Sequence, residues 1–134
     1  MPTNEAFSRV VIDRQLADQG WEVENPNAVR YEYPMPDGTR ADYVLCNRHG
    51  HSMAVIEAKR FSVNPGDATE QTRAYARQLN VPYIFLANGA EIRFWEWETE
   101  AFPRPVKTFF KQDDLERRFA TRQLKRDPTI STSP

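Results

Sequence analysis

The apolar run from Pro82 to Ala87 (PYIFLA) is the feature that most constrains the fold of this chain. An extended segment with no charged side chain over this length must be covered on both faces, as the central strand of a sheet between helices is. The chain has 134 residues, of which 40% are hydrophobic and 28% are charged, and this balance suits one globular domain. No run of about 18 apolar residues occurs, so we expect no membrane-spanning segment. The sequence therefore predicts an α/β domain with helices on both sides of its sheet.

Hydrophobic periodicity and turn residues predict the other elements around this strand. The pairs Asp37-Gly38 and Asn88-Gly89 are typical of tight turns between strands. The patterns predict helices and strands over these ranges: helices 5–19, 68–79 and 112–124, and strands 28–33, 40–46, 52–59, 82–87 and 91–97. The order is α-β-β-β-α-β-β followed by the last helix. It indicates a mixed central sheet flanked by helices.

The second and third predicted strands form a hairpin around a turn at residues 49–50. In a regular antiparallel pair the numbers of opposed residues have a constant sum, and a sum of about 99 fits this turn. Asp42 then lies opposite Glu57, and opposed side chains point to one face with Cβ atoms about 5 Å apart. Lys59 is two residues beyond Glu57 and shares that face. The sequence thus predicts that these three charged side chains lie together.

Two carboxylates at this separation repel each other unless a positive charge lies between them. A divalent cation with oxygen ligands satisfies both, and Mg²⁺, with Mn²⁺ as a substitute, is the expected ion. The carbonyl of Ala58 offers a further oxygen ligand, and Lys59 can position a water molecule or stabilise charge on a phosphate. The alternative is a surface ladder of ion pairs. However, Glu57 and Lys59 close an apolar strand, where charges are costly unless paired or liganded, so the residues favour a metal-dependent phosphodiesterase site.

The helix predicted over 68–79 carries Gln71 and Tyr75 four residues apart, on one face. This spacing alone also fits an amphipathic helix with Tyr75 half buried. Taken with the hairpin, however, the pair resembles the PD-(D/E)XK nuclease superfamily. More narrowly, the chain is similar to the N-terminal nuclease domain of the restriction (motor) subunit of type I restriction enzymes over about residues 3–125. The segments that carry the resemblance are Ala41-Asp42-Tyr43-Val44-Leu45, Glu57-Ala58-Lys59-Arg60, Gln71-x-x-x-Tyr75 and Asn88-Gly89.

The resemblance implies a restriction-endonuclease-like α-β-β-β-α-β core and a DNA endonuclease without sequence specificity of its own. It implies that Asp42 and Glu57 bind Mg²⁺ and that Lys59 is the catalytic lysine. It further implies that Gln71 and Tyr75 support catalysis or contact DNA.

Two further positions bear on this motif set. The resemblance suggests an acidic metal ligand in the first helix; Glu5 is the candidate, with Arg9 one turn further along. Ala41 stands where the superfamily name has a proline, a change that the subfamily tolerates. We therefore expect the site to be complete.

The resemblance also implies partners. Type I restriction subunits carry an ATP-driven translocase after the nuclease, whereas this sequence has no P-loop or helicase motif, so we expect this chain not to bind ATP. We expect residues 1–110 to form the nuclease domain and residues 111–134 to form a basic helix and tail, a linker towards a motor domain. DNA, the helicase domain, and the modification and specificity subunits are the expected partners. The alternative function is a catalytically silent DNA-binding or assembly module that keeps the fold.

The remaining chemistry-bearing residues suggest structural roles. Cys46 is the only cysteine, and with no signal segment a cytoplasmic location is expected. His49 and His51 lie in the hairpin turn, where histidines are more often exposed than metal-bound. The tryptophans are more typical of packing than of base stacking. The net charge is −1, yet basic residues crowd towards the C-terminus, as a phosphate-binding segment or a solvated helix face would have them.

Overall fold

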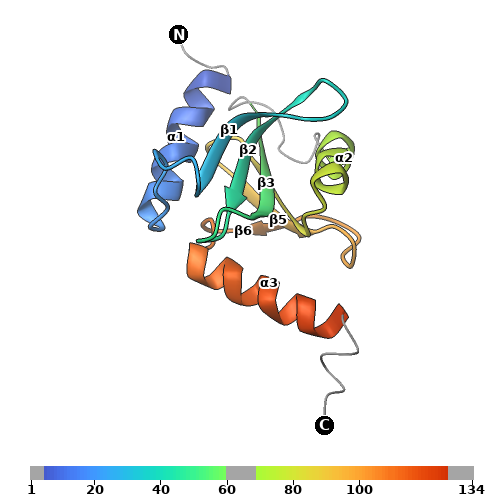
Figure 1. Cartoon of the computed structure of the whole chain (residues 1–134). Coiled ribbons are helices and arrows are strands. Elements are labelled where there is room, and N and C mark those ends of the chain that lie inside the picture. Colours follow the sequence, from blue (N-terminus) through green and yellow to red (C-terminus); the bar gives the residue numbers. More distant parts are fainter. Residues whose placement is uncertain (1–4, 60–68, 127–134) are drawn as a thin grey trace.

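A six-stranded sheet forms the centre of the protein (Figure 1). The computed structural model describes residues 5–59 and 69–126. In chain order the elements are α1 (Glu5–Asp18), β1 (Val29–Pro34), β2 (Arg40–Cys46), β3 (Ser52–Ala58), α2 (Thr69–Leu79), β4 (Tyr83–Ala87), β5 (Ile92–Glu96), β6 (Arg104–Val106) and α3 (Gln112–Arg126). Within these ranges no helix has the length and apolar character needed to cross a membrane.

The strands lie side by side in the order of the chain, and β3–β4 is the parallel pair. The neighbouring pairs β1–β2, β2–β3, β4–β5 and β5–β6 are antiparallel. A parallel pair needs a long crossover connection, and the segment that contains α2 supplies it. The sheet is therefore mixed, as the sequence predicts.

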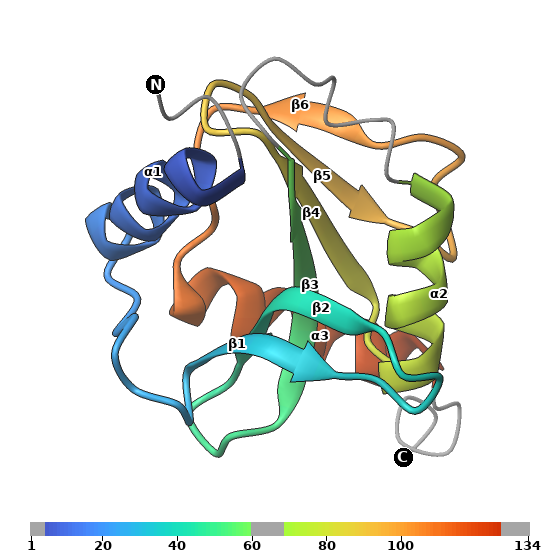
Figure 2. The same ribbon diagram turned by 90° about the horizontal axis from the view of Figure 1, so that it is seen from above.

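Helices cover both faces of the sheet, with α1 and α2 on opposite sides (Figure 2). On one face, Ile12 of α1 and Leu115 of α3 pack with the rings of Phe85 and Phe94 in one apolar core. On the other face, Tyr75 of α2 belongs to a second core that includes Trp95. Strand β4 is buried along its whole length. This two-sided burial confirms the interpretation of the apolar run at 82–87.

Strand β6 is a correction to the sequence-based prediction, which placed no strand between residue 97 and the last helix. Pro103 and Pro105 argue against a strand, because proline cannot donate to the ladder. The structure resolves this conflict by placing β6 outside β5 at the edge of the sheet, where Arg93 lies opposite Pro105. A proline is tolerated there because one side of an edge strand has no neighbour.

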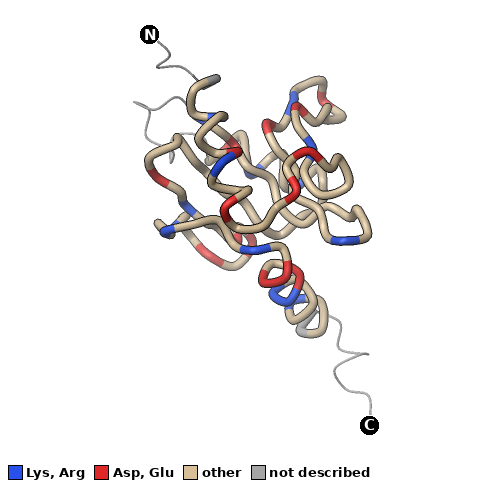
Figure 3. Tube along the Cα trace, turned by 90° about the vertical axis from the view of Figure 1, so that its left-hand side faces the viewer, with Lys and Arg blue, Asp and Glu red and all other residues tan. Residues whose placement is uncertain are grey.

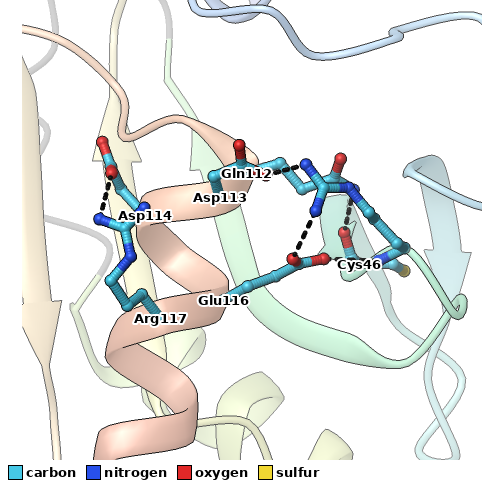
Figure 4. Close-up of polar contacts among 7 residues, drawn as sticks. Cys46, Gln112, Asp113, Asp114, Glu116 and Arg117 are labelled. Atoms are coloured by element: carbon cyan, nitrogen blue, oxygen red, sulfur yellow. Dashed lines mark hydrogen bonds and ion pairs between the residues drawn. The ribbon is translucent and has the colours of Figure 1, made fainter.

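Helix α3 is joined to the β2–β3 turn by its first residues (Figure 4). The Gln112 side chain donates to the Cys46 carbonyl at 2.9 Å, and Glu116 accepts the Arg48 backbone N–H at 2.7 Å. The Arg48 guanidinium also pairs with Asp113. These contacts and buried Leu115 fasten α3 to the sheet, while its role as a linker towards a motor domain stays a prediction.

Candidate functional site

The β2–β3 hairpin has the register that its turn predicts. Tyr43 pairs with Ile56 and Val44 with Val55, and a bulge shifts the register only at the turn end, between Leu45 and Cys46. Continuing the regular part of the ladder sets Asp42 across from Glu57. The Asp42 carboxylate also accepts the Ala58 backbone N–H at 2.8 Å, so it lies directly over the end of β3.

Glu57 is a buried carboxyl group, with only 6% of the residue exposed. It shares a side-chain hydrogen bond with Asp42, and its Oε1 is buried without a hydrogen-bond partner among the described residues. Burial first, and then the hydrogen bond and negative charge of Asp42, raise the pKa of Glu57 to about 9. At neutral pH the raised pKa therefore keeps a proton on Glu57, because a second charge is costly this close to Asp42 in a poorly solvated site.

Lys59 follows directly after β3, at the same end of the strand. Its backbone N–H donates to the Ala87 carbonyl at 2.8 Å, which extends the pairing of β3 with β4 by one step. The positive charge of Lys59 opposes the upward shift of the Glu57 pKa, so the ammonium group acts on the carboxyl pair. The structure thus brings together Asp42, Glu57 and Lys59, the three side chains that the predicted hairpin register places on one face.

Helix α2 lies on the same face of the sheet as this pair, but its two predicted site residues differ in position. Tyr75 is 3% exposed and packs in the core under α2. Burial and the negative charges of Glu57 and Asp42 raise the Tyr75 pKa, and a hydrogen bond with Thr39 partly offsets this rise. Gln71 is exposed, and no hydrogen bond described for it reaches the carboxylates. The structure therefore brings Tyr75 near the site and leaves Gln71 at the solvent.

Two further charged residues complete the site, and sequence reasoning did not assign them. Arg9 of α1 reaches Asp42 with Nη2, and its Nη1 lies 3.1 Å from Glu32 Oε2. The Tyr43 hydroxyl donates to Asp13 of α1 at 2.8 Å and lies 3.2 Å from the Arg9 carbonyl, and so fixes the helix to the sheet at this point. The turn at Asp37-Gly38 could have identified Glu32. It predicts the register of the strands on either side of it, and that register sets Glu32 beside Asp42.

Asp42 and Glu57 suit a divalent cation by the chemistry of their oxygens. The buried Oε1 of Glu57 has no partner in the described part of the chain, and the neighbouring Asp42 carboxylate is mostly buried. Among residues 7–59 and 69–124, no three His, Cys, Asp or Glu side chains gather as a ligand cluster. A metal would thus rest on two carboxylates with backbone, water or substrate oxygens, as Mg²⁺ commonly does. The side chain of Glu5 lies outside the described residues, and the role of the Ala58 carbonyl stays a prediction.

The other candidate residues have structural surroundings. His49 and His51 are exposed in the hairpin turn, and Cys46 is buried as a free thiol. The three tryptophans each donate an indole N–H to a backbone carbonyl, namely Trp21 to Phe110, Trp95 to Glu100 and Trp97 to Val81. They serve packing in this fold, as expected.

The basic residues of α3 are accompanied by acidic ones, and Figure 3 shows both signs close together along this helix. Arg117 pairs with Asp114, and Arg122 pairs with Glu96 and Glu98. The described part of α3 is therefore a neutralised surface rather than an isolated basic patch.

Comparisons with known proteins agree on one family. The family described as "Type I restriction enzyme R protein N terminus" matches residues 23–104. The Escherichia coli type I restriction enzyme EcoAI endonuclease subunit is 33% identical over 88 residues, which cover 55% of this chain and 11% of that subunit. A solved fragment of a protein assigned as the HsdR subunit of a Vibrio vulnificus YJ016 type I restriction enzyme is 29% identical, with a TM-score of 0.76 over 88% of this chain and 25% of that one. This chain thus spans a small part of its relatives' length, and it belongs to the family of type I restriction enzyme R protein N-terminal regions.

Proposed function

We propose that this chain is a metal-dependent DNA endonuclease module of the PD-(D/E)XK type that serves a type I restriction system. The observation that carries the proposal is the pair of Asp42 and Glu57. Burying two adjacent carboxyl groups, one with an oxygen that lacks a hydrogen-bond partner among the described residues, costs free energy that a purely structural site would avoid. A site that takes up a cation recovers this cost when the cation binds.

The roles of the residues follow from their positions. Asp42 and Glu57 would hold the cation, with the Ala58 carbonyl as a further oxygen ligand at the end of β3. A bound divalent cation supplies charge neutralisation at the phosphate and acidifies a water molecule. Lys59, beside the pair, orients the attacking water through its ammonium group and stabilises negative charge on the phosphate oxygens. Tyr75 packs behind this centre, and Gln71 at the solvent side of α2 is positioned to meet the DNA backbone.

The proposed setting comes from the names of the relatives. They are subunits of type I restriction enzymes, so the proposed partners are DNA, a helicase or translocase domain, and the modification and specificity subunits. ATP would act on the translocase and not on the residues of this chain. The nuclease itself would cut without reading sequence, since base recognition belongs to another subunit in this arrangement.

Plasmid nicking tests the proposal directly. The purified chain is incubated with supercoiled plasmid and Mg²⁺ or Mn²⁺, and the open-circular product is measured. Lys59→Ala and Asp42→Asn should lower the nicking rate by at least about 100-fold, the range typical for loss of a charge-stabilising group. Lys107→Ala and Asp18→Asn are the matched controls, since both residues are exposed and lie outside the site.

Two results would refute the assignment. Equal nicking by the wild type and by both site variants would place the activity elsewhere. Salt-sensitive DNA binding without nicking under either metal, together with no measurable metal binding, would instead favour a catalytically silent module.

A further inference from the structure

Three acidic residues form one row across the strands β1, β2 and β3. Tyr31 pairs with Tyr43 and Tyr33 with Ala41, which sets Glu32 across from Asp42. The β2–β3 register continues the row from Asp42 to Glu57. Neighbouring strands are about 4.8 Å apart, so the row leads from the solvent edge of the sheet to the buried carboxyl pair.

Glu32 has an unusual backbone within this row. Its φ is +49°, in the left-handed region that residues other than glycine adopt at a cost in free energy. A strand residue in this conformation leaves the regular ladder, and the Glu32 carboxylate contacts the Arg9 guanidinium. About half of the Glu32 side chain is exposed, so this ion pair faces solvent at the mouth of the site.

Arg9 connects the outer acid to the inner one. Its guanidinium contacts Glu32 and Asp42 at once, and its side chain is one-third exposed, whereas that of Asp42 is 11% exposed. The Tyr43 hydroxyl holds α1 to the sheet through Asp13, one turn from Arg9, so a change of partner would involve the Arg9 side chain and not the helix. The guanidinium therefore lies where it competes with any cation for the outer oxygen of Asp42.

We infer that Arg9 is a built-in competitor for the metal at Asp42 and that Glu32 is the acceptor that holds Arg9 when the metal binds. This inference rests on the proposed function, because it concerns the same metal site. A divalent cation on Asp42 repels a guanidinium on the same carboxylate. Glu32 gives the displaced guanidinium a partner within reach, so metal binding does not leave a half-buried arginine without a counterion. The Arg9–Glu32 pair thus sets the affinity of the site, and both are positioning residues.

The inference predicts opposite effects for the two partners. Removing the competing charge with Arg9→Gln should tighten Mn²⁺ binding by about tenfold or more, since like charges about 5 Å apart repel strongly in a half-buried site. Glu32→Gln should weaken Mn²⁺ binding several-fold, because Asp42 is then the one carboxylate left to Arg9 among the described residues. Arg9→Lys keeps the charge and should stay nearer to the wild type than Arg9→Gln. In the double variant, the effect of Glu32→Gln should shrink.

The measurement is the Mn²⁺ dissociation constant, from electron paramagnetic resonance of free Mn²⁺ and from calorimetry. Arg14→Gln and Glu22→Gln are the matched controls, because both residues are exposed on or after the same helix. Thermal unfolding of each variant checks that the fold is intact. A merely structural role would weaken Mn²⁺ binding in both variants, whereas the inference requires opposite signs.

The outcomes separate this inference from the proposed function. If the wild type binds Mn²⁺ and Arg9→Gln binds it equally or more weakly, the competitor role is wrong and the nuclease proposal is unaffected. If Mn²⁺ binds neither to the wild type nor to Arg9→Gln, the metal site itself is refuted, and the inference fails with it. Binding that appears only in Arg9→Gln would support the inference in its strongest form.

Discussion

Replacing Glu57 with glutamine should make the metal-free protein more stable at alkaline pH. In the folded protein the pKa of Glu57 is raised from 4.5 to about 9, mainly by burial. Between these values the folded state holds a proton on Glu57 that the unfolded state has lost. Raising the pH therefore favours unfolding, and the contribution is lost progressively as the pH climbs from about 5 towards 9.

The size of this effect follows from the shift. Each pH unit between the two pKa values costs the folded state about 1.4 kcal/mol, so the change from pH 5 to pH 8 is about 4 kcal/mol at most. Domains of this kind are stable by only about 5–15 kcal/mol, which makes such a difference easy to detect. Glutamine has nearly the shape of the protonated acid and does not titrate, so the variant lacks this dependence.

Urea unfolding at pH 5, 6, 7 and 8 with a chelator present measures the free energy of unfolding of both proteins. The wild type and Glu57→Gln should differ little at pH 5, and the variant should gain an advantage that grows with each unit. Glu91→Gln, at an exposed position, is the control for the loss of one carboxyl group. A difference that does not change with pH would show that Glu57 ionises normally, and the account of Glu57 as a buried acid that keeps its proton would be wrong.

Three further outcomes follow from the same structure. Metal binding at pH 7.5 should release about one proton, because the ligands must be deprotonated. Calorimetry in buffers of different ionisation enthalpy measures the number of protons released, and Glu57→Gln should release none. Tyr43→Phe should lower the free energy of unfolding by about 1–2 kcal/mol, because the Tyr43 hydroxyl donates to Asp13 at 2.8 Å; urea unfolding with no change in midpoint would contradict this. Phe85→Ala should cost about 3–5 kcal/mol by leaving a cavity among the rings of Phe94 and Phe109; a loss below about 1 kcal/mol would contradict the tight packing described for this core.

The β2–β3 hairpin shows what a local sequence pattern can predict. A turn between two alternating segments sets the register, and the observed pairing of Tyr43 with Ile56 matches it. A bulge near Asp42 would have shifted the predicted register, but the observed bulge lies at the turn end of the hairpin, away from Asp42. Proximity of the carboxyl groups was therefore predictable, whereas the burial that makes Glu57 hold its proton was not.

Arg9 and Glu32 show where local patterns fail. Their contact depends on how α1 packs on the face of the sheet, and no spacing along the chain encodes that placement. The positive φ of Glu32 is likewise a property of the folded strand, since glutamate has no intrinsic preference for it. The edge strand β6 was missed for a related reason, because its proline, Pro105, is acceptable only at a sheet edge.

By itself the sequence determined the order of most elements, the two-sided burial of β4, and the gathering of Asp42, Glu57 and Lys59 at one end of the hairpin. These features depend on periodicity and on short connections, so residues close in the chain decide them. Only the tertiary structure decided which groups are desolvated, which helix covers each face, and that Arg9 from α1 reaches Asp42. The ionisation of a carboxyl group, and the competition of cations for it, depend on all the groups around it. Those groups come from segments that are distant in the chain.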